Sequence, residues 1–276
     1  MFSSRDSLGL NTTNRSEKMR MSNAKALLGY GAFMLATASE AHQIWYEQLP
    51  GQPLALYYGE YDKNVLEVTP GGMDRFRQLQ AWSMADRSAP LQLSLQRQAF
   101  LLAEQPGQED SLLAQDLHYP MFDVQEGGKT LKAAWTPATR WVGDLRARSP
   151  ELTLDIVPTG VADAGRAQFR VFYAGKPLTG QEVMLETASG EVFKQRSDAA
   201  GNVSFTLPWQ GTYVVAVEYQ DNSPGERLDP AGKPERFDVK RFSSTLSFHR
   251  RQGQAPLPRA PSQLPASEVA RLKKSA

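Results

Sequence analysis

The sequence predicts an all-β protein: two antiparallel β-sandwich units that follow a cleaved signal peptide and precede a disordered tail. Three observations predict this. Short runs of strand-forming residues alternate between apolar and polar positions and are separated by Gly- and Pro-containing turns. A short apolar run lies near the N-terminus, and the C-terminal end is basic and rich in proline. We place the segments at residues 1–41 (signal peptide), 42–158 (first β domain), 159–249 (second β domain) and 250–276 (tail).

The N-terminal segment has the three parts of an export signal in the right order. Lys25 precedes the apolar run 26–38, which is too short for a membrane span of roughly 20 residues. Ser39 and Ala41 are small residues at the positions that a signal peptidase requires for a cut after Ala41. The alternative is a buried first helix of a cytoplasmic protein. The order of features favours export to the periplasm, with His42 as the first residue of the mature chain.

The first β domain is predicted from apolar and alternating runs between turns such as Pro50-Gly51 and Gly127-Gly128. Short helices are expected only at Met73–Leu79 and Pro137–Leu145. The expected strands are 54–61, 78–83, 91–98, 100–103, 131–135 and 151–158.

The second β domain shows strands at short, regular intervals with glycine turns, which is typical of an antiparallel sandwich. Phe242, Leu246 and Phe248 lie on one face of its last strand. Residues 222–234 hold Pro, Gly and charges and should form a long surface loop. The expected strands are 167–174, 182–187, 191–196, 203–207, 211–219 and 242–249.

Charge and composition exclude several classes of protein. Asp and Glu outnumber Lys and Arg by 26 to 20 between residues 42 and 249, so no concentrated basic face for nucleic acid is expected. The chain has no Cys, hence no disulfide and no lipid-anchored cysteine. No later stretch is apolar enough to cross a membrane. The proline-rich tail should stay unfolded because it buries little apolar surface, apart from a short terminal helix at 267–274.

The chain has three histidines, His42, His118 and His249, and we treat all three as candidate metal ligands. A mature N-terminal His42 offers an amine and an imidazole, which together chelate late first-row ions such as nickel, cobalt or copper. His118 lies between Asp116 and Met121, two further potential ligands. The plain alternative is structural: His118 stabilises a loop, and His249 ends a strand beside two arginines. Of Trp45 and Tyr46, one should pack in the core and the other could shield a metal.

The segment His42-Gln43-Ile44-Trp45-Tyr46-Glu47 resembles the mature start of a periplasmic family of unknown function that is labelled NikM-like, for nickel-uptake components. The second half resembles the carboxypeptidase-regulatory or transthyretin-like module, an immunoglobulin-like β-sandwich, with which members of that family end. The similarity lies in the motifs GKPLTGQEV (175–183), SDAAGNVSF (197–205) and GTYVV (211–215). These motifs mark a fold and do not specify a function.

The resemblance implies a periplasmic accessory protein that binds nickel, cobalt or copper and passes the ion to a membrane metal transporter or a TonB-dependent receptor. No nucleophile elbow, zinc-protease motif or phosphate loop is present, so we expect no enzyme. Two alternatives remain open. One is a non-enzymatic module that binds a protein or glycan, and the other is a copper monooxygenase with an N-terminal histidine brace.

Overall fold

Strands dominate the chain, as predicted. The computed structural model describes residues 42–163 and 165–275, and the predicted signal peptide, residues 1–41, lies outside the described residues. Residues 42–275 belong to one compact unit. No helix in the described ranges is long and apolar enough to span a membrane.

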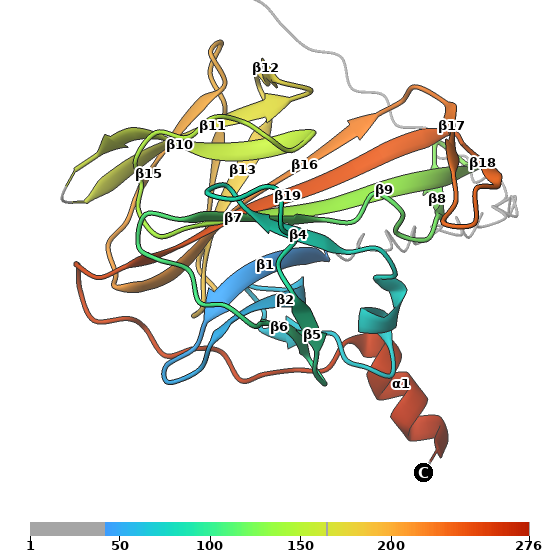
Figure 1. Cartoon of the computed structure of the whole chain (residues 1–276), viewed down its shortest axis with the longest axis horizontal. Helices are drawn as coiled ribbons and strands as arrows, with labels where there is room; N and C mark the ends of the chain where they lie inside the picture. Colours follow the sequence, from blue (N-terminus) through green and yellow to red (C-terminus); the bar gives the residue numbers. More distant parts are fainter. Residues whose placement is uncertain (1–41, 164, 276) are drawn as a thin grey trace, which may run out of the picture. The chain divides into compact units, whose positions relative to one another are not determined.

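The centre of the fold is an eight-stranded sheet that draws on both halves of the chain (Figure 1). Its strands pair antiparallel except β9 and β19, which run parallel from the pair Ala133–Val239 to the pair Val142–Phe248. In spatial order the strands are β14 (Val192–Arg196), β13 (Glu182–Thr187), β16 (Gly211–Asp221), β19 (Val239–Arg250), β9 (Lys129–Val142), β7 (Ser111–Gln115) and β4 (Gln80–Ser83), with β8 (Phe122–Glu126) also on β9.

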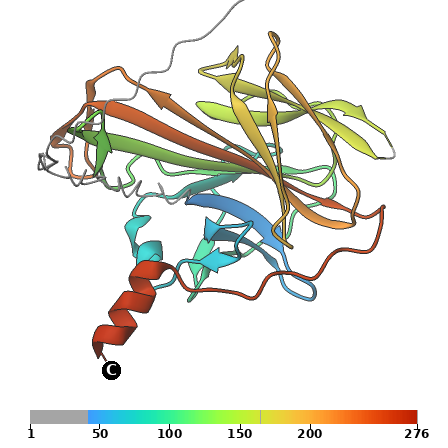
Figure 2. The same cartoon turned by 180° about the vertical axis from the view of Figure 1, so that it is seen from behind.

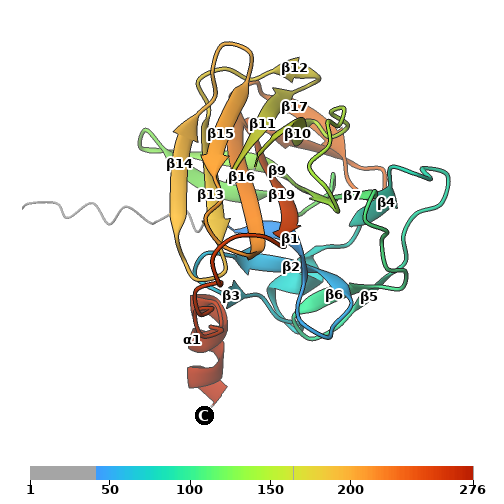
Figure 3. The ribbon, with the colours of Figure 1, turned by 90° about the vertical axis from the view of Figure 1, so that its left-hand side faces the viewer.

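Two smaller sheets cover the two faces of this central sheet (Figures 1 and 3). The first contains β1 (Gln43–Gln48), β2 (Leu54–Glu60), β3 (Val65–Leu66), β5 (Leu93–Leu95) and β6 (Ala99–Leu102). The second contains β10 (Leu154–Ala162), β11 (Arg166–Tyr173), β12 (Lys176–Pro177) and β15 (Asn202–Thr206). A separate ribbon, β17 (Gly225–Leu228) with β18 (Pro234–Phe237), begins inside the predicted loop 222–234 and extends three residues beyond it.

The period of two along β19 explains how one strand serves two cores. Phe242, Leu246 and Phe248 join β16 and the second sheet in the largest apolar cluster. The intervening Ser243 and Thr245 face the first sheet, where Thr245 Oγ1 donates to the Ile44 carbonyl at 2.7 Å. The predicted apolar face of this strand is therefore confirmed, and its polar face is also buried.

The expected domain boundary between residues 158 and 159 is wrong, because it falls inside β10. Pro158 coincides with a shift of register against β11 instead of ending the strand. The central sheet also unites strands from both predicted domains, so the two halves share one fold. The sequence shows where strands lie, but not which distant strands pair.

The two expected helices also differ from the structure. Residues 72–75 form one short 3-10 turn, η1 (Gly72–Arg75), in place of a helix over 73–79. Pro137 lies inside β9, opposite Ser243, and its carbonyl accepts a bond from the Asp116 amide. Burial of β9 over most of its length outweighs the helical pattern that we inferred for 137–145.

The tail beyond β19 has little regular structure until α1 (Ala266–Ser275), which confirms the expected terminal helix. The preceding residues were expected to be disordered, yet they contact the body at defined positions. Isolated bridges join Gln254 to Trp209 and Gln263 to Val65. Polar contacts with the body, instead of apolar burial, keep this segment bound.

A buried ion pair connects β9 with β10. Arg140 and Asp155 are both fully buried, and the guanidinium donates to the two carboxylate oxygens at 3.2 and 2.6 Å. Its remaining donors reach Ser111 Oγ and the Ser149 carbonyl, while Asp155 also accepts from the backbone amides of residues 151 and 152. Each of the three guanidinium nitrogens thus has at least one acceptor, as a buried charge pair requires.

We predict that Asp155→Ala lowers the free energy of unfolding by about 3–5 kcal/mol, because it leaves the Arg140 guanidinium buried without its counter-charge. Chemical denaturation measures this loss. Asp123→Ala, which removes an exposed ion pair with Lys132, is the matched control and should leave stability nearly unchanged. Equal losses in the two variants would contradict the prediction.

Candidate site around His42

His42 lies directly before β1, and its side chain is 11% exposed. Its Nε2 is 2.9 Å from Glu67 Oε1. An ionised carboxylate can only accept a hydrogen bond, so Nε2 carries the proton in the neutral ring and Nδ1 carries the lone pair. Nδ1 is the ring nitrogen nearer the backbone nitrogen of the same residue. The carboxylate therefore selects the tautomer that an N-terminal chelate needs.

Glu67 reaches His42 because the chain turns back after β3. The Glu67 amide donates to the Tyr58 carbonyl at 2.9 Å and extends the pairing of β2 with β3. Gly72, at the start of η1, leaves room for the carboxylate. A Cβ at position 72 would lie 2.2 Å from Glu67 Oε2. Neither Glu67 nor Gly72 was predicted from the sequence, because no motif marks a contact across 25 residues.

Aromatic rings form one side of the site. The Tyr58 ring centroid is 5.2 Å from that of His42, and the Tyr58 and Tyr119 hydroxyls are 3.1 Å apart. Trp135 and Phe76 complete the cluster, with ring centroids 4.6 Å and 5.1 Å from Tyr119. Burial, then the neighbouring Tyr119, raises the pKa of Tyr58 far above its usual range. The Tyr58 phenol therefore stays neutral, and the aromatic rings together form an apolar wall beside His42.

His118 lies beside Tyr119 in the loop after β7. Asp116 Oδ1 accepts the His118 backbone amide at 2.8 Å, and Arg227 donates to the carbonyls of Leu117 and Tyr119 at 2.9 and 2.7 Å. Burial raises the pKa of Asp116. Among the described residues, His118 Nδ1 is buried and has no hydrogen-bond partner. The loop is thus rigid, with one imidazole nitrogen left unmatched.

His249 lies far along β19 from this cluster. It pairs with Thr212 near the end of the strand and is exposed. Ser243, which accepts a bond from Trp135 Nε1, is six residues earlier, or roughly 20 Å along a strand. Partial burial of the ring, then Arg251, lowers the pKa of His249.

The structure does not gather the three histidines into one ligand set. Within residues 42–163 and 165–275, no group of three or more His, Asp or Glu side chains is placed to hold a metal ion. Among the described residues, His42 forms a close side-chain pair with Glu67. Trp45 and Tyr46 are both fully buried, and the Tyr46 hydroxyl lies 3.3 Å from the Leu113 carbonyl, so both belong to the core.

A pocket of about 260 Å³ opens on the other side of Gln43. Glu186 from β13 is 4% exposed there and accepts a hydrogen bond from Gln43 Nε2 at 2.7 Å. Burial, followed by the charge of Asp62, raises the pKa of Glu186 to about 8. This carboxyl therefore holds its proton through much of the neutral range.

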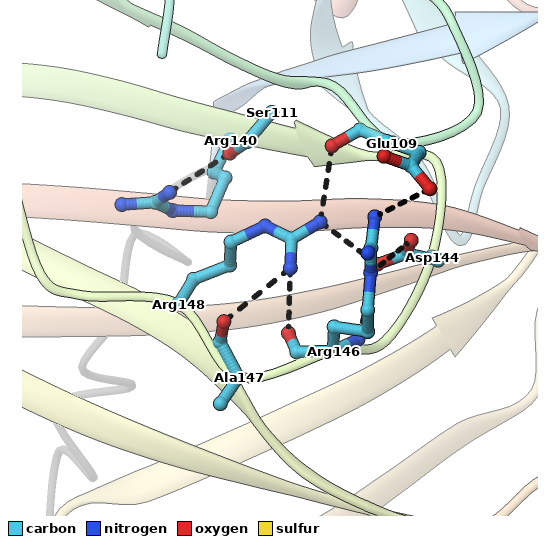
Figure 4. Close-up of polar contacts among 7 residues, drawn as sticks. All are labelled: Glu109, Ser111, Arg140, Asp144, Arg146, Ala147 and Arg148. Carbon is cyan, nitrogen blue, oxygen red and sulfur yellow. Dashed lines mark hydrogen bonds and ion pairs between the residues drawn. The ribbon is translucent and has the colours of Figure 1, made fainter. Parts of the chain in front are cut away.

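The basic residues after β9 form a scaffold instead of an open anion site (Figure 4). The Arg148 guanidinium donates to the carbonyls of Glu109, Arg146 and Ala147 and pairs with Asp144 at 2.8 Å. Arg146 pairs with both Asp144 and Glu109. These contacts engage the guanidinium groups of both arginines and fix the connection between β9 and β10.

The fold defines an all-β protein with a histidine–carboxylate pair at the edge of an aromatic cluster. Residues 129–221, about a third of the chain, match a family described as a domain of unknown function (DUF4198). The matched region runs from the first residue of β9 to the last of β16 and contains none of the three histidines. Comparison with curated proteins found no match, and comparison with solved structures found none.

We predict that Gly72→Ala displaces the Glu67 carboxylate and abolishes the preference of His42 for a proton on Nε2. Two-bond ¹H–¹⁵N correlations of the imidazole at pH 8 report the tautomer. Gly165→Ala is the control, because an added methyl there meets no atom within 4 Å. An unchanged tautomer in Gly72→Ala would show that Glu67 does not set it.

We predict that Glu186 makes the protein less stable as pH rises. Its pKa is raised from 4.5 to about 8 on folding, so the folded state binds more protons between these values. The contribution of Glu186 to the free energy of unfolding is greatest below pH 4.5 and falls toward pH 8, by up to about 1.4 kcal/mol per pH unit. Glu186→Gln should flatten this decline in urea denaturation between pH 5 and 8. Parallel curves for the two proteins would contradict it.

Proposed function

We propose that this chain is a periplasmic protein that binds a nickel, cobalt or copper ion for uptake or handling, with His42 as the anchor. The observation that carries the proposal is the position of His42. It directly follows the predicted signal cleavage site, and Glu67 holds its ring. The proposal favours binding over catalysis.

The chemistry of the anchor supports a late first-row ion. Cleavage after Ala41 would give His42 a free amine, and the amine and Nδ1 of one residue form a two-point nitrogen chelate. Such nitrogen ligands suit nickel, cobalt and copper. Glu67 would then act on the other ring nitrogen, the role that a carboxylate plays beside many metal-bound histidines.

The proposal includes transfer of the ion in preference to permanent storage. No third His, Asp or Glu side chain joins His42 and Glu67 within the described part of the chain. An ion held by a two-point chelate retains open positions, through which a membrane metal transporter or a TonB-dependent receptor can take it. The resemblance of residues 42–47 to NikM-like proteins agrees with this role.

A second candidate is a non-enzymatic module that binds a protein or glycan. The extent of the family match favours it, because residues 129–221 cover the central strands and omit every histidine. The histidine-brace monooxygenase is supported less well, since it needs a second histidine beside His42. His118 and His249 do not join His42 and Glu67 in a common ligand group.

We predict that mature protein beginning at His42 binds Ni²⁺ or Cu²⁺ at least 100-fold more tightly than protein carrying five extra residues before His42, which put the new terminal amine too far along the chain to chelate with the ring. The extension removes the free amine and keeps the fold. Calorimetry on both forms measures the difference, and His249→Ala is the matched control. Equal affinities for the two forms would refute the chelate.

The same titration tests the carboxylate. Removing a carboxylate that orients a metal-bound histidine typically weakens metal binding 10–100-fold. We expect a loss of this size from Glu67→Gln in the mature protein. A loss in the extended protein as well would show that the effect does not pass through the N-terminal chelate.

A further inference from the structure

The C-terminal tail crosses the first sheet as a strap. From the end of β19 it runs past β1 and β2 to α1 (Figures 1 and 2). Residues 251–258 are exposed throughout, so they bury little apolar surface. Gly253 and Gln254 bond to residues 208–210, and side-chain contacts of the tail with the first sheet begin at Arg259.

Arg259 fills a position that is built for a guanidinium. It forms an ion pair with Glu47, donates to Asn64 Oδ1 at 3.3 Å and lies over the Tyr61 ring, 5.8 Å from its centroid. Glu47 and Asn64 are each 4% exposed. Burial raises the pKa of Glu47, and the charge of Arg259 opposes that shift. A carboxylate, an amide oxygen and an aromatic face together match the planar cation of arginine.

The residues after Arg259 add to the open side of β3. Asn64 Nδ2 donates to the Ala260 carbonyl at 2.6 Å, so one asparagine contacts both the guanidinium and the next peptide group. Gln263 donates its amide to the Asn64 carbonyl at 2.9 Å and accepts from the Leu66 amide at 3.0 Å. Backbone pairing gives affinity for any extended segment, and the arginine position gives specificity.

These contacts hold the strap by polar groups and not by a core. The Arg259 side chain is 31% exposed, and the residues that connect it to β19 have no other regular pairing than the bridge at Gln254. Segments of this kind open locally at low free energy. Opening takes the counter-charge away from Glu47, which favours replacement of Arg259 by another cation.

We propose that the groove formed by Glu47, Tyr61, Asn64 and β3 is a recognition site for an arginine-bearing extended segment of a partner protein, and that the chain's own residues 259–263 occupy it as a competing strap. The partner presents an arginine whose following backbone pairs with β3. The bound state of the tail shows the contacts that such a segment would make. The strap thereby couples partner binding to release of the C-terminus.

The proposal is tested with the full chain and a fluorescent peptide of residues 255–265. The Arg259→Ala chain, whose strap is weakened, should bind this peptide at least 10-fold more tightly than the wild-type chain, because the tethered strap competes at high local concentration. A peptide with Arg259→Ala should bind at least 10-fold more weakly. Fluorescence anisotropy measures each affinity.

Two groove variants serve as controls on the Arg259→Ala background. Glu47→Gln removes the charge, and Asn64→Gly removes both amide contacts while retaining the left-handed backbone at φ 50°. Each should lower peptide affinity. Equal binding of the Arg and Ala peptides, or full binding by the Glu47→Gln variant, would overturn the proposal.

Limited digestion with proteinase K gives an independent measurement. The segment 251–265 should be cut faster in the Arg259→Ala chain than in the wild type, at unchanged cleavage of the body. Equal rates would show that Arg259 does not hold the strap and would overturn its role as competitor. Because metal is absent from both experiments, their outcome is independent of the chelate at His42.

Discussion

The parallel pairing of β9 with β19 is the constraint on which the rest of the structure depends. It joins residues 133–142 to residues 239–248 and so makes one sheet from the two halves of the chain. A sheet buried on both faces needs a cover on each, and the two smaller sheets supply them. The Thr245 hydroxyl, 2.7 Å from Thr139 Oγ1 on β9 and bonded to the Ile44 carbonyl on β1, lies where the central pair meets the first sheet. Through that contact the start of the described chain is fixed over the middle of the molecule.

The two faces of the strand β1 contact two different clusters of side chains. Its alternation directs Ile44 and Tyr46 to the aromatic cluster that His42 adjoins, and Trp45 to a second cluster that contains Tyr61. Glu47 lies on the same face of β1 as Trp45 and forms an ion pair with Arg259. The short strand β3 and the residue that follows it also contact both sites. Leu66 pairs with the strap, and Glu67, directly after β3, contacts His42. Asn64 and Leu66, which bind the strap, and Glu67, which binds His42, thus lie within four consecutive positions of the chain.

Local patterns were sufficient to predict many of the strands but not their partners. The alternation of residues 242–248 and the spacing of the second-half turns gave strands that the structure confirms. Pairing across a hundred residues leaves no local mark, so the boundary at 158 was misplaced inside β10. His42 was selected as a candidate ligand from its position after a predicted cleavage site. Glu67 could not, since a glutamate in an alternating segment is ordinary until Gly72 makes room for it. The contacts of the tail were missed for the same reason: its order comes from a few polar groups, which composition does not reveal.

Three buried carboxyl groups illustrate how the source of a counter-charge decides what a site can do. Asp155 receives a guanidinium and two amides from neighbouring strands and loops, so its partners stay in place for as long as the fold exists. Burial and then acidic neighbours raise the pKa of Glu186, against the hydrogen bond from Gln43, so this carboxyl retains a proton instead. The counter-charge of Glu47 is Arg259, which lies on the strap. The strap lies outside the three main sheets and is connected to β19 by exposed residues. A charge compensated by a detachable segment can exchange partners, whereas one compensated within the core cannot. That difference, and not the presence of an ion pair as such, is what distinguishes the groove beside β3 from the buried pair beneath β9.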